Sequence, residues 1–391
     1  MLGQRIKQFR LAKGWSQDEL VSKLDHIVTK TALSKYERGL MKPSLTVLKK
    51  IAKLFNVKLI QLNTFPNYTT ELIAYRKRLK LSKKNEEIIE NVIKVEMENR
   101  LSLLEKLNLL HNVCISFKEF TVNSFEDCET AAETLRNSWN IGNNPIANLT
   151  SILEENNINV FFIDADTKFD GISLIVKNSE NNVVAAAVVS RNNLPWSRQR
   201  LNIAHELGHL FLNVNKTINE EKAAFRFAAA LLAPQNAIFA YFGKKRSVIQ
   251  LDELFIFKKL FGISAQALIY RLGDLNIITQ TYKTSLFKLI NYSGFKINEP
   301  FEMKPENSSL FINLISRAYS EKLISIDETN KFSVQSILGK QKNRINDKLQ
   351  FMQLGTIKKK EYLQKNADAI KEHYFSSSEW KDFLEGDIIE Y

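Results

Sequence analysis

Two histidines four residues apart are the feature of this sequence that most directly implies chemistry. His205 and His209 flank Glu206 in the stretch LNIAHELGHLFL, residues 201–212, and the whole chain of 391 residues contains five histidines. Residues four apart in a helix lie about 40° apart around its axis, so both imidazoles can reach a single metal ion. Two imidazoles suit zinc, and Glu206 would lie near a metal-bound water, placed to take its proton.

A buried pair of uncoordinated histidines is the alternative interpretation. The residues around the motif are apolar, which predicts a helix that is buried apart from this polar cluster. Gly208 is expected to leave room for a neighbouring backbone to approach closely. A chance HExxH pattern is rare in a chain with so few histidines, so we interpret the motif as a metal site.

A third protein ligand is needed, since catalytic zinc sites usually have three. The other three histidines are distant in sequence and have no matching context. The segment NEEKAAFRFAAALLAP, residues 219–234, is predicted to form a second buried helix, and Glu221 lies on its inward stripe. Glu220 is the alternative third ligand. Either acid could instead interact favourably with the dipole at the helix N-terminus without binding metal.

Three apolar runs precede the HELGH helix. INVFFID, GISLIVK and VVAAAVVS are short and β-branched, and they are separated by Asp170-Gly171 and by the turn-forming stretch NSENN. This pattern predicts three strands of one small sheet. Strands followed by the HExxH helix are the context that the motif needs.

Basic residues are concentrated near the N-terminus. The whole chain carries a net charge of +12, and residues 1–66 hold 13 Lys and Arg against 4 Asp and Glu, a net of +9. Such a segment favours a polyanionic partner, although charge alone is equally compatible with a lysine-rich surface. Four short helices are predicted there, with Ser16 and Glu19 as a capping box for the second. Their sequences are RIKQFRLAKG, SQDELVSKL, TKTALSKYERG and PSLTVLKKIAKLF.

Residues 1–62 resemble the XRE or Cro/C1-type helix-turn-helix family through SQDEL, TKTALSKYERG and KPSLTVLKKIAKLFNV. The turn before the third helix reads HIVTK rather than the usual glycine-valine-serine form. The resemblance implies double-stranded DNA as a partner, with the third helix in the major groove. A protein-docking module of the same shape is the alternative. By this resemblance the candidate base readers are Lys30, Thr31 and Lys35, and the candidate phosphate contacts are Gln17 and Arg38.

The region from 140 to 280 resembles the ImmA/IrrE family of zinc metallopeptidases. The similarity rests on FDGISLIV, VVAAAVVS, RQRLNIAHELGHLFLN, EKAAFRFAAALLAP and KKLFGISAQALIYRLGDLNII. It implies His205, His209 and Glu221 as zinc ligands and Glu206 as general base. Family members frequently have Glu-Ala-Asn where this chain has Ala223-Ala224-Phe225.

The sequence therefore predicts an α+β protein of four regions. These are a helix-turn-helix domain at 1–66, a helical connector at 67–135, a zincin-like metallopeptidase domain with a small β-sheet at 136–285, and a helical C-terminal region of unknown role at 286–391. The connector is expected either to form a homodimer or to pack on the catalytic domain. The absence of a long apolar run or a signal peptide predicts a cytoplasmic protein with no membrane partner.

Two functions from different classes follow. The first is a DNA-binding zinc endopeptidase that regulates transcription by cleaving a protein substrate, an XRE-type repressor or itself, in stress response, mobile-element control or defence. The second is a transcription regulator whose metallopeptidase-like domain senses a ligand or partner and cleaves nothing. Glu206 favours the first because a sensor does not need it, and the missing Glu-Ala-Asn keeps the second open. A peptidase whose helix-turn-helix docks a protein is a weaker third.

Overall fold

The computed structural model describes residues 2–64, 68–74, 82–110, 117–295, 298–326, 328–329, 360 and 364. The chain forms two compact units, residues 1–318 and 319–391, and the elements below belong to the first, apart from the last residues of its final helix. Within the described residues, no single helix is long and apolar enough to span a membrane. Helices α10 and α11 meet that length and composition only as a pair, bent by 62°.

The N-terminal domain is a bundle of short helices around one core. Ser16 caps α2 by accepting from the amide of Glu19, whose carboxylate accepts from the Ser16 amide in return, so the predicted capping box is confirmed. Leu33 and Ile51 lie fully buried at the centre of the bundle. The helices are α1 (Leu2–Ala12), α2 (Gln17–Lys23), α3 (Lys30–Glu37), α4 (Leu45–Phe55) and α5 (Leu59–Asn63).

Two details of this domain differ from the sequence prediction. The structure adds α5, whose five residues are too few for a helical period to be recognised in the sequence. Helical spacing predicts Leu45 on one apolar face with Leu48, Ile51, Ala52 and Phe55, but Leu45 is 62% exposed. Leu45 is the first residue of α4, directly after the capping residue Ser44, and so lies at the very end of the apolar face.

A mixed four-stranded sheet forms the centre of the second domain, with the order β1-β4-β5-β3. The three predicted strands are confirmed as β3 (Ile158–Ile163), β4 (Gly171–Lys177) and β5 (Val183–Arg191). Strand β3 is parallel to β5, and β4 is antiparallel to β5. The edge strand β1 (Thr69–Ala74) was not predicted, and it pairs antiparallel with β4 although it comes from the connector.

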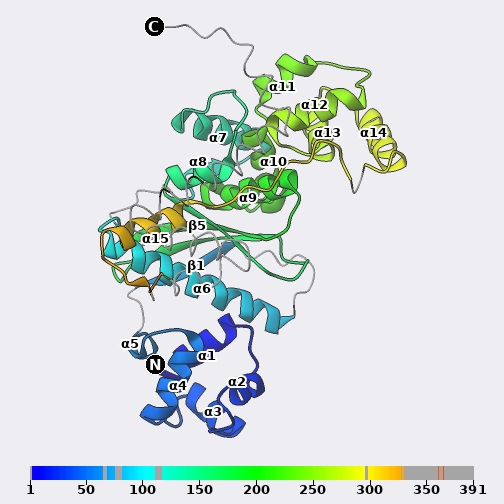
Figure 1. Cartoon of the computed structure of the whole chain (residues 1–391). Coiled ribbons are helices and arrows are strands. Elements are labelled where there is room, and N and C mark those ends of the chain that lie inside the picture. Colours follow the sequence, from blue (N-terminus) through cyan, green and yellow to red (C-terminus); the bar gives the residue numbers. More distant parts are fainter. Residues whose placement is uncertain are drawn as a thin grey trace. The chain divides into compact units, whose positions relative to one another are not determined.

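Strict alternation of side chains divides this sheet between two cores. Ile172, Leu174 and Val176 of β4 face the core that contains α6 (Lys83–Lys106). Ile175, on the opposite face, belongs to the core that contains the HExxH helix. Figure 1 shows α6 on one side of the sheet and α8, α9 and α10 on the other. The helices of this second layer are α7 (Phe125–Ser138), α8 (Leu149–Glu155), α9 (Trp196–Phe211) and α10 (Glu220–Leu232).

Four further helices form a separate apolar cluster beyond α10. They are α11 (Gln235–Phe242), α12 (Leu251–Phe261), α13 (Ala265–Asp274) and α14 (Gln280–Tyr292). Helix α15 (Leu310–Ser320) places Phe311 beneath the guanidinium of Arg100 on α6, 4.3 Å from the ring centroid. A short parallel ladder joins β2 (Phe120–Val122) to β6 (Leu212–Val214), directly after the HExxH helix.

The connector is part of both domains rather than a free linker. Helix α6 contributes Val95 to the core of the helix-turn-helix domain and Ile93 to the core beneath the sheet. Arg5 of α1 also forms an ion pair with Glu98 of α6 at 2.9 Å. The structure therefore shows the packing alternative for this segment, and dimer formation stays a prediction. The predicted boundary at residue 135 falls inside α7, which packs into the core of the HExxH helix.

Candidate metal centre

The sequence-predicted metal residues converge at the crossing of α9 and α10. His205 and His209 are 0% and 2% exposed, and their Nε2 atoms lie 3.0 Å apart. One carboxylate completes the group: Glu221 places Oε1 3.4 Å from His209 Nε2 and Oε2 3.6 Å from His205 Nε2. One ligand atom from each of the three residues lies within 4.8 Å of the other two. Two nitrogens bound tetrahedrally to one zinc ion would be about 3.3 Å apart, so the donor set fits zinc.

A hydrogen bond between the two imidazoles would by itself explain the distance between their nitrogens. It does not explain why both oxygens of Glu221 approach those same two nitrogens. The Glu221 side chain is 46% exposed, so a solvated position was open to it at little cost. The three side chains are therefore placed so that they could hold one metal ion.

Gly208 is the reason that α9 and α10 cross closely enough for this. A Cβ atom at Gly208 would lie 3.1 Å from a ring carbon of Phe227 and 3.3 Å from the Cα of Ala224. The close backbone approach predicted at this glycine is therefore confirmed. It brings the first turn of α10, where Asn219 caps the helix by accepting from the Lys222 amide, beside the histidines of α9.

Glu206 is 1% exposed and lies against the first residue of β4. A Cβ atom at Gly171 would be 3.0 Å from Glu206 Cγ and 2.9 Å from the carbonyl oxygen of Val189. Gly171 thus leaves the space that the Glu206 side chain occupies. In the sequence, Asp170-Gly171 signals only a turn, and nothing in the local sequence identifies Glu206 as the neighbour of this glycine.

Phe225 covers one side of the site. Its ring centroid lies 4.2 Å from that of His205, with the ring planes 55° apart. Phe225 stands one turn after Glu221 on α10, at the position where Asn is frequent in the resembling family. The site is therefore lined by an aromatic ring on this side, and its most exposed candidate ligand is Glu221.

The N-terminus of α9 is fixed by residues 298–309, for which the sequence indicates no role. Residues 298–309 were expected to be helical, but the structure shows an irregular strap without helix. Glu299, Glu302 and Glu306 of this strap each accept hydrogen bonds from the first amides of a different helix. These helices are α13, α9 and α8 respectively. Carboxylates at helix N-termini satisfy amides that have no partner within the helix and interact favourably with its dipole.

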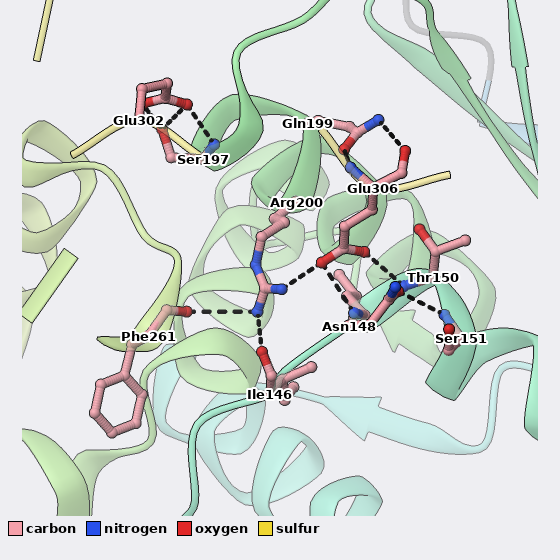
Figure 2. A network of polar contacts seen from close by, with 11 residues as sticks. Ile146, Asn148, Thr150, Ser151, Ser197, Gln199, Arg200, Phe261, Glu302 and Glu306 are labelled. Carbon is pink, nitrogen blue, oxygen red and sulfur yellow. Dashed lines mark hydrogen bonds and ion pairs between the residues drawn. The ribbon is translucent and has the colours of Figure 1, made fainter. Parts of the chain in front are cut away.

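Figure 2 shows the most buried part of this strap. Arg200 of α9 donates to Glu306, and it also donates to the carbonyl oxygen of Ile146 at 2.8 Å. Gln199 is joined to the Glu306 backbone by two hydrogen bonds, one in each direction. Burial lowers the pKa of Arg200, and the neighbouring Glu306 opposes that change. The strap thus anchors the helix that carries both histidines, one and a half turns before the site.

The structure describes all five candidate DNA-contacting residues. Lys30, Thr31 and Lys35 are exposed on α3, which begins at Lys30 after the capping residue Thr29. Gln17 is half-buried and donates to Glu37 at 2.8 Å, which fixes its amide beside α3. Arg38 is exposed, and its Nε donates to the carbonyl oxygen of Ser34.

Comparisons with known proteins match two separate regions of the chain. Residues 6–62 match the family model described as helix-turn-helix, and residues 154–273 match the model described as IrrE N-terminal-like domain. The chain therefore combines an XRE-type helix-turn-helix domain with an IrrE/ImmA-like domain in an α+β fold, as the sequence predicts. The second match contains all four candidate residues of the metal centre.

The N-terminal domain is also similar to curated proteins. It is 45% identical over 58 residues to the HTH-type transcriptional regulator SinR of Bacillus subtilis (strain 168), and equally to that of Bacillus licheniformis. The aligned part covers 15% of this chain and 50% of each relative. The chain thus spans about half the length of these relatives, all of it within the helix-turn-helix domain.

Proposed function

We propose that the protein is a DNA-binding zinc endopeptidase that regulates transcription by cleaving a repressor, in trans or in itself. The observation that carries this proposal is the convergence of His205 and His209 of α9 with Glu221 of α10, with Glu206 on the same buried helix as the two histidines. The similarity to the IrrE N-terminal-like domain and to a named transcriptional regulator supports the pairing of the two activities. The cytoplasmic location expected from the sequence stays a prediction.

The chemistry divides among the residues of the site. When bound, zinc would act as a Lewis acid on the peptide carbonyl and on the attacking water. His205 and His209 would hold the ion through Nε2, and Glu221 through its carboxylate. Glu206 would accept the proton of the attacking water and pass it to the leaving amine nitrogen.

The N-terminal domain would direct this activity to DNA. In the proposed complex α3 lies in the major groove, where Lys30, Thr31 and Lys35 meet base edges, and Gln17 and Arg38 contact phosphates. Exposure of the three α3 side chains supports this assignment. The Lys30 ion pair with Asp18, 2.6 Å long, is exposed, so it costs little to exchange for a phosphate or base contact.

A non-cleaving sensor is the second candidate, and one observation favours it. His205, Glu206 and His209 are at most 2% exposed, whereas a peptidase must admit a polypeptide to these groups. In that case the metal would serve structure or ligand sensing, and partner binding would change DNA affinity without cleavage. A peptidase whose helix-turn-helix domain docks a protein and not DNA is the weaker third candidate, because the positive charge of that domain favours a polyanion.

Metal content tests the site directly. The purified full-length protein should carry about one zinc per chain by elemental mass spectrometry, and His205→Ala or His209→Ala should lose most of it. His26→Asn is the matched control, because His26 is exposed in the helix-turn-helix domain and Asn tolerates its positive φ of 54°. Equal zinc in the wild type and both site variants would exclude the metal centre.

A further inference from the structure

The second nitrogen of His209 has a specific neighbour that the proposed metal site does not use. Nε2 of this ring faces His205 and Glu221, and Nδ1 lies on the other side, 3.5 Å from Oε1 of Glu220. Among the described residues, no hydrogen bond of ordinary geometry reaches Nδ1, although the atom is buried. The ring is 2% exposed, so water offers it little compensation.

The chemistry of a metal-binding imidazole makes this neighbour informative. A neutral imidazole carries one proton, and a nitrogen that gives its lone pair to a metal cannot hold it. If His209 binds through Nε2, the proton must be on Nδ1. A buried N–H without an acceptor is costly, and carboxylates commonly accept from the outer nitrogen of metal-binding histidines.

Glu220 and Glu221 lie in different positions relative to the two histidines. Consecutive residues of a helix point about 100° apart, and here only Glu221 approaches Nε2 of both histidines. Lys118 also approaches Glu220, with Nζ 3.4 Å from Oε1, the same oxygen that faces His209. The Lys118 amide also donates to the carbonyl oxygen of Leu210, the residue after His209, so this lysine is tied to the HExxH helix.

We propose that Glu220 is a positioning residue of the metal centre. It accepts a hydrogen bond from Nδ1–H of His209 and holds the tautomer and ring orientation in which Nε2 faces the ion. Lys118 holds the same carboxylate through its ion pair. The inference rests on the proposed zinc site, and it assigns to Glu220 a role outside the ligand set.

Zinc affinity is the main test, measured on the full-length protein by competition with a fluorescent zinc chelator. Glu220→Ala should weaken zinc binding about 10- to 100-fold, the usual effect of losing such an outer partner. Glu220→Gln should lie between the wild type and Glu220→Ala, because an amide oxygen can still accept from Nδ1–H. Lys222→Ala is the matched control, since Lys222 is exposed on the same helical turn and should not change the affinity.

Two spectroscopic measurements separate positioning from ligation and from general destabilisation. Cobalt-substituted Glu220→Ala should keep the visible absorption bands of the wild type, because its three ligands are unchanged, whereas Glu221→Ala should alter them. Nitrogen-15 NMR of the zinc-loaded wild type should show the Nδ1–H tautomer for His209. That signal should exchange faster with water in Glu220→Ala. The Glu220 side chain is 54% exposed, so its variants are expected to fold.

The outcomes are distinguishable. Wild-type zinc affinity in Glu220→Ala would overturn the positioning role and leave the proposed metal site standing. Loss of metal in Glu220→Ala together with retention in Glu221→Ala would make Glu220 the ligand, which also overturns the inference. A wild-type protein that binds no zinc would contradict the proposed function itself.

Discussion

Gly171 and Glu206 lie in contact across the boundary between β4 and the HExxH helix. A methyl group on the glycine would meet Glu206 Cγ at 3.0 Å and the Val189 carbonyl oxygen at 2.9 Å. The backbone carbonyl sits within the sheet and cannot retreat, so the glutamate side chain would have to move. The position of the proposed general base thus depends on the absence of a side chain on the neighbouring strand.

Gly171→Ala should therefore displace Glu206 while leaving the histidines in place. If the proposed function holds, cleavage of the proposed repressor substrate should fall about tenfold or more while zinc content stays near normal. Overpacking should also lower the free energy of unfolding by about 1–3 kcal/mol. Ser173→Ala is the control, because Ser173 lies two residues further along the same face of β4 and is fully buried. Unchanged cleavage and stability in Gly171→Ala would show that Glu206 does not need this space.

Glu206→Gln separates the peptidase from the sensor. The amide keeps the size of the side chain but cannot accept the proton, so cleavage should fall about 10²- to 10⁴-fold while zinc content and thermal stability stay near the wild type. Cells carrying each version are compared by gel for fragments of an XRE-type repressor encoded beside the gene, or of the protein itself. Identical regulation with no fragment in either version would favour the sensor.

Breaking the Arg200–Glu306 pair should destabilise the second domain. Arg200 and Glu306 form a buried ion pair, with side-chain exposures of 0% and 4%. Arg200→Met or Glu306→Ala should each cost about 3–5 kcal/mol in urea unfolding, because each leaves a buried charge without its partner. The double variant should cost less than the sum. Glu302→Ala is the control with a smaller effect, since the Glu302 side chain is 33% exposed. Losses below about 1 kcal/mol would contradict this.

The HExxH helix and the three sheet strands were predictable because their signals are local. A period of about four residues identifies His205 and His209 as neighbours, and β-branched runs identify strands wherever they occur. Helical periodicity also predicted that Glu221 faces inward. Only the distances in the structure show that Glu221, and not Glu220, lies near Nε2 of both histidines. Caps such as Ser16 were predictable for the same reason, since their partners lie three residues away.

What the sequence did not predict depends on contacts between distant segments. Strand β1 is six residues long and lies in a connector dominated by helical patterns, and its partner β4 is about a hundred residues away. Glu306 meets Arg200 and the amides of α8 only after the chain has passed through α11 to α14. Such pairings follow from the tertiary fold and leave no periodic pattern in a single sequence.

DNA binding should be strongly dependent on salt. Full-length protein is the right material, because Val95 of α6 completes the core of the helix-turn-helix domain. Affinity for fragments upstream of its own or a neighbouring gene should fall steeply between 50 and 200 mM salt, as is typical when several phosphates are contacted. Lys35→Ala should weaken preferred sites more than random DNA, and Arg38→Ala should weaken both similarly. Binding that is absent or insensitive to salt in fluorescence anisotropy would favour the protein-docking alternative.

A buried carboxyl group on α6 predicts how stability depends on pH. Burial raises the pKa of Glu96 to about 7 from an ordinary value of 4.5, and the attraction of Arg100 only partly opposes this. The folded protein therefore holds this proton to higher pH than the unfolded chain does. The stabilisation from the protonated group is complete below pH 4.5 and is lost as the pH rises to 7.

Glu96→Gln removes this dependence, because its side chain does not titrate. The difference in free energy of unfolding between Glu96→Gln and the wild type should grow in favour of the variant between pH 4.5 and 7, by up to about 3 kcal/mol. Comparing the two proteins at each pH by urea denaturation cancels the other titrating groups that they share. Glu98→Gln is the control on the same helix, since its side chain is 19% exposed and already paired with Arg5. A difference between Glu96→Gln and the wild type that stays constant across this range would show that Glu96 titrates alike in the folded and unfolded chains.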